Sequence, residues 1–247
     1  MKRYKTLLFD VDGTLLDFDA AEENGLRTVF SEILRENTWG NVQDTASCIQ
    51  SQDTGPSVAD LIGTYREVNH NLWDSYEKGL ITKDEITDTR FNAVFERHGI
   101  RADGIGAEQR YRYLLNRSAI LVQGAEKVLE YLMDRYDLYV VTNGFLETQN
   151  MRMKDSGLVR FFRHSFISEE VGYQKPQKEF FDYCFDHIVQ ADRSRTLIIG
   201  DSLKSDILGG NNAGIDTCWY NPSGSERAPG ITVDMEIREL EELVELL

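Results

Sequence analysis

The stretch Lys5 to Leu16, KTLLFDVDGTLL, decides the fold. Its apolar run, Thr6 to Phe9, predicts a strand buried on both faces, as in a parallel sheet, and the glycine that follows predicts a turn. Two aspartates, Asp10 and Asp12, stand at the end of this strand. Because like charges held close together repel, such a pair raises a pKa or attracts a cation, and it indicates a functional site. The alternative is an ordinary strand end with an Asp-Gly turn, which would explain Asp12 and its glycine alone.

The composition is that of a globular protein with an acidic surface. The 247 residues include 27 basic and 42 acidic side chains, which gives a formal net charge of -15. Nucleic-acid polymers and membrane surfaces are not expected partners, because both select positive surfaces. A small anionic substrate would therefore need a local positive group or a metal ion. The apolar run after the basic N-terminus stops at Asp10, so no signal peptide or spanning helix is predicted and the cytoplasm is the expected location.

Three cysteines, Cys48, Cys184 and Cys218, lie far apart in the chain. Their spacing fits neither a paired metal site nor a disulfide framework. We expect reduced thiols with a structural role.

The hundred or so residues after Leu16 show helical periodicity. The spacing predicts helices at 20–34, 57–78 and 82–98. The sequence Thr82-Lys-Asp-Glu85 is a capping-box pattern, so a helix is expected to begin there. The segment 38–56 is irregular and is predicted to be a connection, with a loop facing the active site as the alternative. The aromatic residues expected in the core of this helical bundle are Tyr65, Trp73, Tyr76, Phe91 and Phe95.

From Gly124 onward, helical and strand patterns alternate, which is typical of βαβ units and a parallel sheet. The predicted strands cover 138–142, 166–168, 196–200 and 217–220. The predicted helices cover 127–135, 146–155, 177–188, 204–212 and 237–247.

Three of the predicted strands end in polar residues. Asp10 and Asp12 follow the first strand, Thr142 and Asn143 end the second, and the first aspartate of GDSLKSD, Asp201, follows the strand at 196–200. Ligands of open α/β sheets bind outside the carboxyl ends of the strands, so these groups are expected to converge. Several carboxylates together form an oxygen-rich site that suits Mg2+.

Lys175 and the backbone N–H groups of Asn143 and Gly144 would add anion-binding capacity to this site. Taken singly, each signal has a structural explanation. The sequence GDSLKSD can cap a helix, and a lysine before a proline is usually solvated. The occurrence of all four signals in this order at strand ends favours the functional interpretation.

Together these motifs resemble those of the haloacid dehalogenase (HAD) superfamily, in its phosphatase branch. DVDGT corresponds to the first motif of that family, Thr142-Asn143 to the second, Lys175 to the third and GDSLKSD to the fourth. The resemblance covers nearly the whole chain. It implies an α/β fold with a Rossmann-like three-layer core and a parallel sheet, formed by residues 1–16 and 117–247. It also implies an inserted all-α helical cap domain at residues 17–116.

The resemblance also assigns catalytic roles to matching positions. Asp10 would be the nucleophile, which forms an aspartyl-phosphate, and Asp12 the general acid and base. The expected phosphate-binding residues are Thr142, Asn143 and Lys175.

A magnesium ion is the cofactor that the resemblance implies. Asp10, Asp201 and the carbonyl oxygen of Asp12 would hold it. Asp206 would support the site without contacting the ion.

Several other functions share parts of this pattern. A dehalogenase uses the same nucleophile but needs neither Mg2+ nor an acid for its leaving group, so Asp12 and the acidic pair of GDSLKSD favour a phosphate ester. A sugar-phosphate phosphatase or phosphomutase keeps both aspartates of DVDGT and stays open as an alternative. A non-catalytic phosphometabolite-binding or scaffold protein is disfavoured because every catalytic position is retained.

Three features resemble the bacterial pyrimidine 5'-nucleotidase branch of the superfamily. They are TNGF at 142–145, its spacing to GYQKP, and the closing sequence EIRELEELVELL. This resemblance implies small-molecule phosphomonoester substrates, namely dUMP, dTMP, UMP and modified analogues. The helical insert carries no motif that we assign to recognition of a base.

Overall fold

The structure is a computed structural model that describes residues 4–40 and 55–247. The chain divides into two compact units. We call the first, Met1–Asp19 with Asn116–Leu247, the α/β unit, and the second, Ala20–Leu115, the helical unit.

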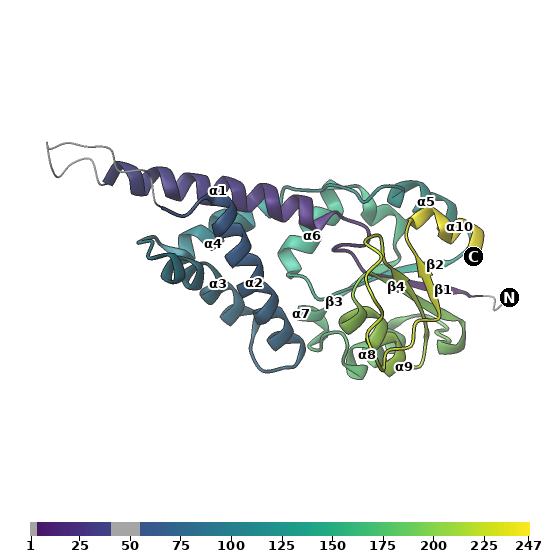
Figure 1. Cartoon of the computed structure of the whole chain (residues 1–247). Coiled ribbons are helices and arrows are strands. Elements are labelled where there is room, and N and C mark those ends of the chain that lie inside the picture. Colours follow the sequence, from purple (N-terminus) through teal and green to yellow (C-terminus); the bar gives the residue numbers. More distant parts are fainter. Residues whose placement is uncertain (1–3, 41–54) are drawn as a thin grey trace, which may run out of the picture. The chain divides into compact units, whose positions relative to one another are not determined.

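The α/β unit is built on a six-stranded sheet in which every neighbouring pair of strands is parallel (Figure 1). The strand order is β3-β2-β1-β4-β5-β6, which places β1 (Thr6–Phe9) between β2 (Asp137–Thr142) and β4 (Thr196–Gly200). The outer strands are β3 (His164–Ile167), β5 (Asp216–Tyr220) and β6 (Met235–Ile237). The strand predicted from the opening stretch is therefore a central strand of the sheet.

Alternation along β1 divides the core into two layers. Leu7 and Phe9 pack in a cluster with α5 (Ala125–Leu132) and the C-terminal segment, whereas Leu8 packs with α8 (Lys178–His187) on the opposite face. In Figure 1, α5 and α10 (Leu243–Leu246) lie on one side of the sheet and α8 and α9 (Leu208–Ala213) on the other. These helices and the sheet form three layers.

Short elements complete the α/β unit. They are α6 (Leu146–Asp155), α7 (Ser168–Val171), η1 (Leu158–Phe161), η2 (Arg193–Arg195), η3 (Leu203–Ile207) and η4 (Leu240–Glu242). The predicted helix at 204–212 begins as a π-helical turn, η3, before it continues as α9. The predicted closing helix at 237–247 is wrong at its start, because Ile237 pairs with Tyr220 at the end of β6. Only the short η4 and α10 follow it.

The helical unit contains α1 (Phe18–Gly40) from Ala20 onward, together with α2 (Val58–Glu77), α3 (Lys83–His98) and α4 (Gly104–Leu115). The capping box predicted at Thr82 is confirmed, because its side chain accepts a hydrogen bond from the Glu85 N–H and the Glu85 carboxylate accepts one from the Thr82 N–H. The predicted end of the first helix at residue 34 is wrong, since α1 continues to Gly40. Within the rest of the irregular segment predicted at 38–56, residues 41–54 lie outside the described residues.

The core of the helical unit is aromatic. Tyr65 and Phe91 are fully buried, and their ring centroids lie 5.0 Å apart. Phe95 is buried with them, as predicted. Trp73 and Tyr76 were predicted in this core, but they are only partly buried. They lie near the end of α2, where their rings pack edge to face against each other.

Two further sequence predictions can be compared with the structure. Cys184 and Cys218 are free, buried thiols on opposite faces of the sheet, while Cys48 lies outside the described residues. Across residues 4–40 and 55–247, no helix is long and apolar enough to cross a membrane.

Candidate active site

Three adjacent strands bring the predicted site residues to one edge of the sheet. Asp10 directly follows β1, Thr142 is the last residue of β2, and Asp201 directly follows β4. Because β1 lies between the other two strands and all three are parallel, residues nearly 200 positions apart in sequence become neighbours. Asp10 and Thr142 are buried, and Asp201 is partly exposed.

Lys175 lies at the centre of this group. Its ammonium nitrogen is 2.6 Å from Asp10 Oδ1 and 2.6 Å from Asp206 Oδ1, and it donates a third hydrogen bond of 2.8 Å to the carbonyl of Val141. The three donors of the ammonium are thus directed to three oxygens. Burial by itself lowers the pKa of Lys175, but the Asp10 and Asp206 carboxylates outweigh burial and raise this pKa above its ordinary value. The lysine is therefore charged.

Asn143 fixes the backbone of Lys175. Its side-chain oxygen accepts a hydrogen bond of 2.9 Å from the Lys175 N–H, and its amide nitrogen donates one of 2.8 Å to the Lys175 carbonyl. The same amide donates to Ser205 Oγ at 3.3 Å. The side chain of Asn143 thus holds the loop that carries Lys175. Next to it, Thr142 Oγ1 accepts a hydrogen bond of 3.0 Å from the Gly144 N–H.

The π-helical turn η3 returns Asp206 to the end of β4. Asp206 Oδ2 accepts a hydrogen bond of 3.0 Å from the Ser202 N–H, while Oδ1 accepts from Lys175. A Cβ atom at Gly200 would overlap the Asp206 carboxyl group, so only glycine leaves room for this return. Both Asp206 oxygens thus accept hydrogen bonds from within the α/β unit.

Asp201 is held from two sides. Thr14 donates a hydrogen bond of 3.2 Å to Asp201 Oδ1, and the indole N–H of Trp219 donates one of 2.8 Å to the Asp201 carbonyl. Gly13 has a positive φ of 86°, and a Cβ atom there would lie 2.6 Å from Asp201 Oδ2. The glycine of DVDGT therefore serves both the turn and the close approach of this carboxylate. Sequence reasoning did not identify Thr14 or Trp219.

The carboxylates of Asp10, Asp201 and Asp206 could hold a metal ion, since one oxygen of each lies within 4.8 Å of the others. Burial raises the pKa of Asp10 well above its ordinary value, and although Lys175 opposes this effect, Asp206 adds to it. Burial likewise raises the pKa of Asp201 to about 7, with the Asp206 charge as the next cause. When all three carboxylates are ionised, their negative charge exceeds the single positive charge of Lys175. An all-oxygen set of this kind fits Mg2+.

The carboxylate of Asp12 points to different partners. Gln149 Nε2 donates to Asp12 Oδ2, and Arg152 Nη1 forms an ion pair with Asp12 Oδ1. Both partners belong to α6, whose buried residues are Thr148, Gln149, Arg152 and Met153. Sequence reasoning missed Gln149 and Arg152. The sequence of α6 is mostly polar, so it gave no signal that these two side chains are buried.

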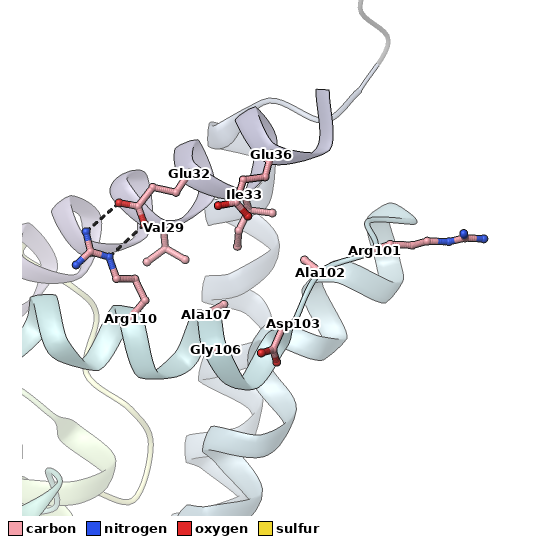
Figure 2. Close-up of a pocket in the computed structure, with 10 residues that line it drawn as sticks. All are labelled: Val29, Glu32, Ile33, Glu36, Arg101, Ala102, Asp103, Gly106, Ala107 and Arg110. Atoms are coloured by element: carbon pink, nitrogen blue, oxygen red, sulfur yellow. Dashed lines mark hydrogen bonds and ion pairs between the residues drawn. The ribbon is translucent and has the colours of Figure 1, made fainter. Parts of the chain in front are cut away.

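A separate cavity of about 360 Å3 lies within the helical unit. Figure 2 shows that Arg110 is bound to Glu32 and that the Arg101 side chain extends away from the cavity. Glu36 and Asp103 also line it, so its surface carries several acidic groups. Such a lining does not favour a phosphate group.

Comparisons with known proteins identify the family of this chain. The family model of haloacid dehalogenase-like hydrolases matches residues 4–214. The HAD-hydrolase YfnB of Bacillus subtilis strain 168 is 44% identical over 247 residues, which cover 100% of this chain and 97% of the relative. A crystal structure of that protein bound to magnesium has a TM-score of 0.84 and covers 100% of this chain and 99% of its own.

Two further relatives are named as pyrimidine 5'-nucleotidases. PynA of Streptococcus pneumoniae is 38% identical and YjjG of Escherichia coli is 32% identical. Each match covers 99% of this chain, with 95% of PynA and 98% of YjjG. The chain belongs to the haloacid dehalogenase-like hydrolase family. The predicted family and α/β fold class are thereby confirmed.

Proposed function

We propose that this hydrolase is a Mg2+-dependent phosphomonoester hydrolase that acts through an aspartyl-phosphate on Asp10. The observation that carries the proposal is the position of Asp10, at the tip of a central strand and 2.6 Å from the ammonium of Lys175. An anionic nucleophile needs a cation beside it if it is to approach an anionic phosphate ester. Lys175 supplies that charge in an otherwise acidic protein.

In the first step, a carboxylate oxygen of Asp10 attacks phosphorus in line with the leaving group. The P–O bond to the leaving group breaks as the bond to Asp10 forms, and Asp12 gives its proton to the departing alkoxide. In the second step, water attacks phosphorus and the P–O bond to Asp10 breaks as Asp12 takes a proton from that water. Inorganic phosphate leaves, and both carboxyl groups return to their starting states.

The charge of Lys175 would attract the phosphoryl group, and the hydroxyl of Thr142 and the N–H group of Asn143 would bind its oxygens. Asp10, Asp201 and the carbonyl of Asp12 would hold Mg2+, which supplies further positive charge for those oxygens. Asp206 would keep Lys175 in place through their 2.6 Å contact.

The proposed substrates are pyrimidine nucleoside 5'-monophosphates, with dUMP, dTMP, UMP and modified analogues as candidates. Two relatives that match nearly the whole chain are named as pyrimidine 5'-nucleotidases, which supports this choice. The helical unit would act as a cap that limits access of water and selects the substrate.

The direct test of the nucleophile is phosphate release by Asp10→Asn. We expect turnover to disappear while the circular dichroism spectrum stays that of the native protein, because the amide cannot form the acyl phosphate. Asp134→Asn, an exposed position, is the matched control and should behave as the native protein. Near-normal phosphate release by Asp10→Asn would refute the assignment.

The substrate is tested separately with a panel of nucleoside monophosphates and sugar phosphates in the presence of Mg2+. We expect the highest kcat/KM for pyrimidine monophosphates. A preference for sugar phosphates, or the appearance of an isomerised sugar phosphate, would support the phosphatase or phosphomutase alternative. In that case the nucleotidase proposal fails while the role of Asp10 stands.

A further inference from the structure

We propose that Gln149 and Arg152 are positioning residues that set the orientation of the Asp12 carboxyl group during catalysis. The inference rests on the proposed function, because it assigns their effect to proton transfer by Asp12. Both side chains contact that carboxyl group, one at each oxygen.

The environment of Arg152 makes its orientation specific. The side chain is fully buried, its Nε donates a hydrogen bond of 3.0 Å to the carbonyl of Ser118, and its guanidinium carbon lies 5.7 Å from the centre of the Phe18 ring. With the guanidinium held by these contacts, Nη1 points toward Asp12. A buried guanidinium held on three sides can fix the carboxylate that it contacts.

Gln149 is fixed by the chain around it. It is 1% exposed, and a Cβ atom at Gly144 would overlap its amide nitrogen. The glycine of the TNG turn thus leaves the space that Gln149 needs to reach Asp12. The two positioning residues lie three positions apart on α6, which places them on the same face of the helix.

Two buried polar atoms beside Asp12 are left over by these contacts. Among the residues that the structure describes, Gln149 Oε1 and Arg152 Nη2 have no hydrogen-bond partner. Buried polar atoms without partners cost stability and are rare in proteins. Positioning of the Asp12 carboxyl group would explain why two such polar side chains are kept here. A role in core stability alone would be served as well by apolar residues on this face of α6.

The experiment compares two aryl phosphates of similar size, phenyl phosphate and p-nitrophenyl phosphate. Phenolate is the poorer leaving group, so its departure depends more on a positioned general acid, and kcat/KM reports this first step. The variants are Gln149→Met and Arg152→Met, which remove the donors at similar volume. We expect kcat/KM for phenyl phosphate to fall about 100-fold and that for p-nitrophenyl phosphate less than about 10-fold, within the range that general acids contribute.

Three measurements separate positioning from a structural effect. Thr148→Val removes the 2.7 Å hydrogen bond between α6 and Asn116 without touching Asp12, and it should change both esters by the same factor. Inhibition by inorganic phosphate should be unchanged in Gln149→Met, because the phosphate site at Lys175 is intact. Arg152→Lys should recover part of the lost selectivity, since it retains a cation for Asp12. If Arg152→Met does not fold, Gln149→Met and Arg152→Lys carry the test.

An equal fall for both esters, no change, or a rate increase in the methionine variants would overturn the inference. An increase would mean that Gln149 and Arg152 hold Asp12 away from the substrate. Asp12→Asn is measured in parallel. If Asp12→Asn alters the ratio between the esters and the α6 variants do not, the positioning role fails and the proposed function stands. If Asp12→Asn leaves the ratio unchanged, or the native protein releases no phosphate, both fail together.

Discussion

Lys175 Nζ lies 2.6 Å from Asp206 Oδ1, and both side chains are buried at the end of β4. The same ammonium contacts Asp10, so one cation compensates two carboxylates. Removal of one partner of a buried ion pair leaves the others uncompensated, which is the costly change at such sites.

Lys175→Met is therefore expected to lower the free energy of unfolding by about 3–5 kcal/mol in the absence of metal, and to abolish phosphatase activity. The loss of unfolding free energy should be smaller at acidic pH, because protonation neutralises the carboxylates that no longer have a lysine partner. Urea denaturation in EDTA at two pH values measures both effects. Lys178→Met is the control, since that exposed lysine pairs with Asp182 on the surface and its removal should cost less than about 0.5 kcal/mol. Equal effects of the two variants would contradict this account of the cluster.

Magnesium is expected to stabilise the protein more at about pH 8 than at about pH 5.5. The pKa of Asp201 is raised from 3.8 to about 7. Between a pH of 3.8 and a pH of about 7, the folded state therefore binds more protons than the unfolded state. The metal-free protein should therefore lose stability as the pH rises through this window. A cation that binds the ionised carboxylates of the folded state competes with those protons and restores stability.

The measurement is the thermal midpoint Tm with MgCl2 and with EDTA at both pH values. In EDTA the Tm should fall as the pH rises, and MgCl2 should remove most of that fall. Asp201→Asn should weaken this pH dependence because the amide does not titrate, whereas Asp10 keeps its raised pKa. A magnesium effect of the same size at both pH values would argue against metal binding at these carboxylates.

Gly200→Ala is expected to displace Asp206 and with it Lys175. The added methyl group overlaps the Asp206 carboxyl group, which is held by two hydrogen bonds and cannot move freely. Overpacking of this kind costs about 1–3 kcal/mol, and we expect a large loss of kcat as well. Gly63→Ala is the control, because Gly63 is an exposed position in α2 with open space around it. That variant should gain about 0.5–1 kcal/mol, so similar Tm values for the two variants would refute the prediction.

The positions at the strand ends could be predicted from the sequence because parallel strands deliver their last residues to the same edge. Asp10, Thr142 and Asp201 required only that each apolar run be recognised as a strand. The distance between them in the chain is irrelevant once the sheet is assembled. Lys175 was singled out as a positive group directly before Pro176 at a predicted helix start, and its phosphate-binding role came from the family resemblance.

Other features depend on packing that periodicity does not encode. Gln149 and Arg152 look like solvent-facing residues of a polar helix, yet both are buried against Asp12. The three-residue strand β6 is defined by its pairing with β5. The helix α4 lies beyond the predicted helices, and its two glycines, Gly104 and Gly106, weaken its local propensity.

The last prediction concerns a buried ion pair in the helical unit. Arg90 is 3% exposed, and its guanidinium binds Glu108 through Nε at 2.7 Å and Nη2 at 2.5 Å, with Nη1 donating to Asn69 at 3.0 Å. The neighbouring Tyr65 and Tyr111 rings also face the guanidinium. Arg90→Met leaves a buried carboxylate unpaired and should destabilise the protein by about 3–5 kcal/mol.

The double variant Arg90→Met with Glu108→Leu should recover much of that loss, because it removes the stranded charge as well as its partner. Arg97→Met on the same helix breaks an exposed pair with Glu67 and should cost less than about 1 kcal/mol. Calorimetric unfolding of the three variants provides the comparison. A double variant as unstable as Arg90→Met alone would show that the arginine acts through the tyrosine rings and Asn69 rather than by compensating Glu108.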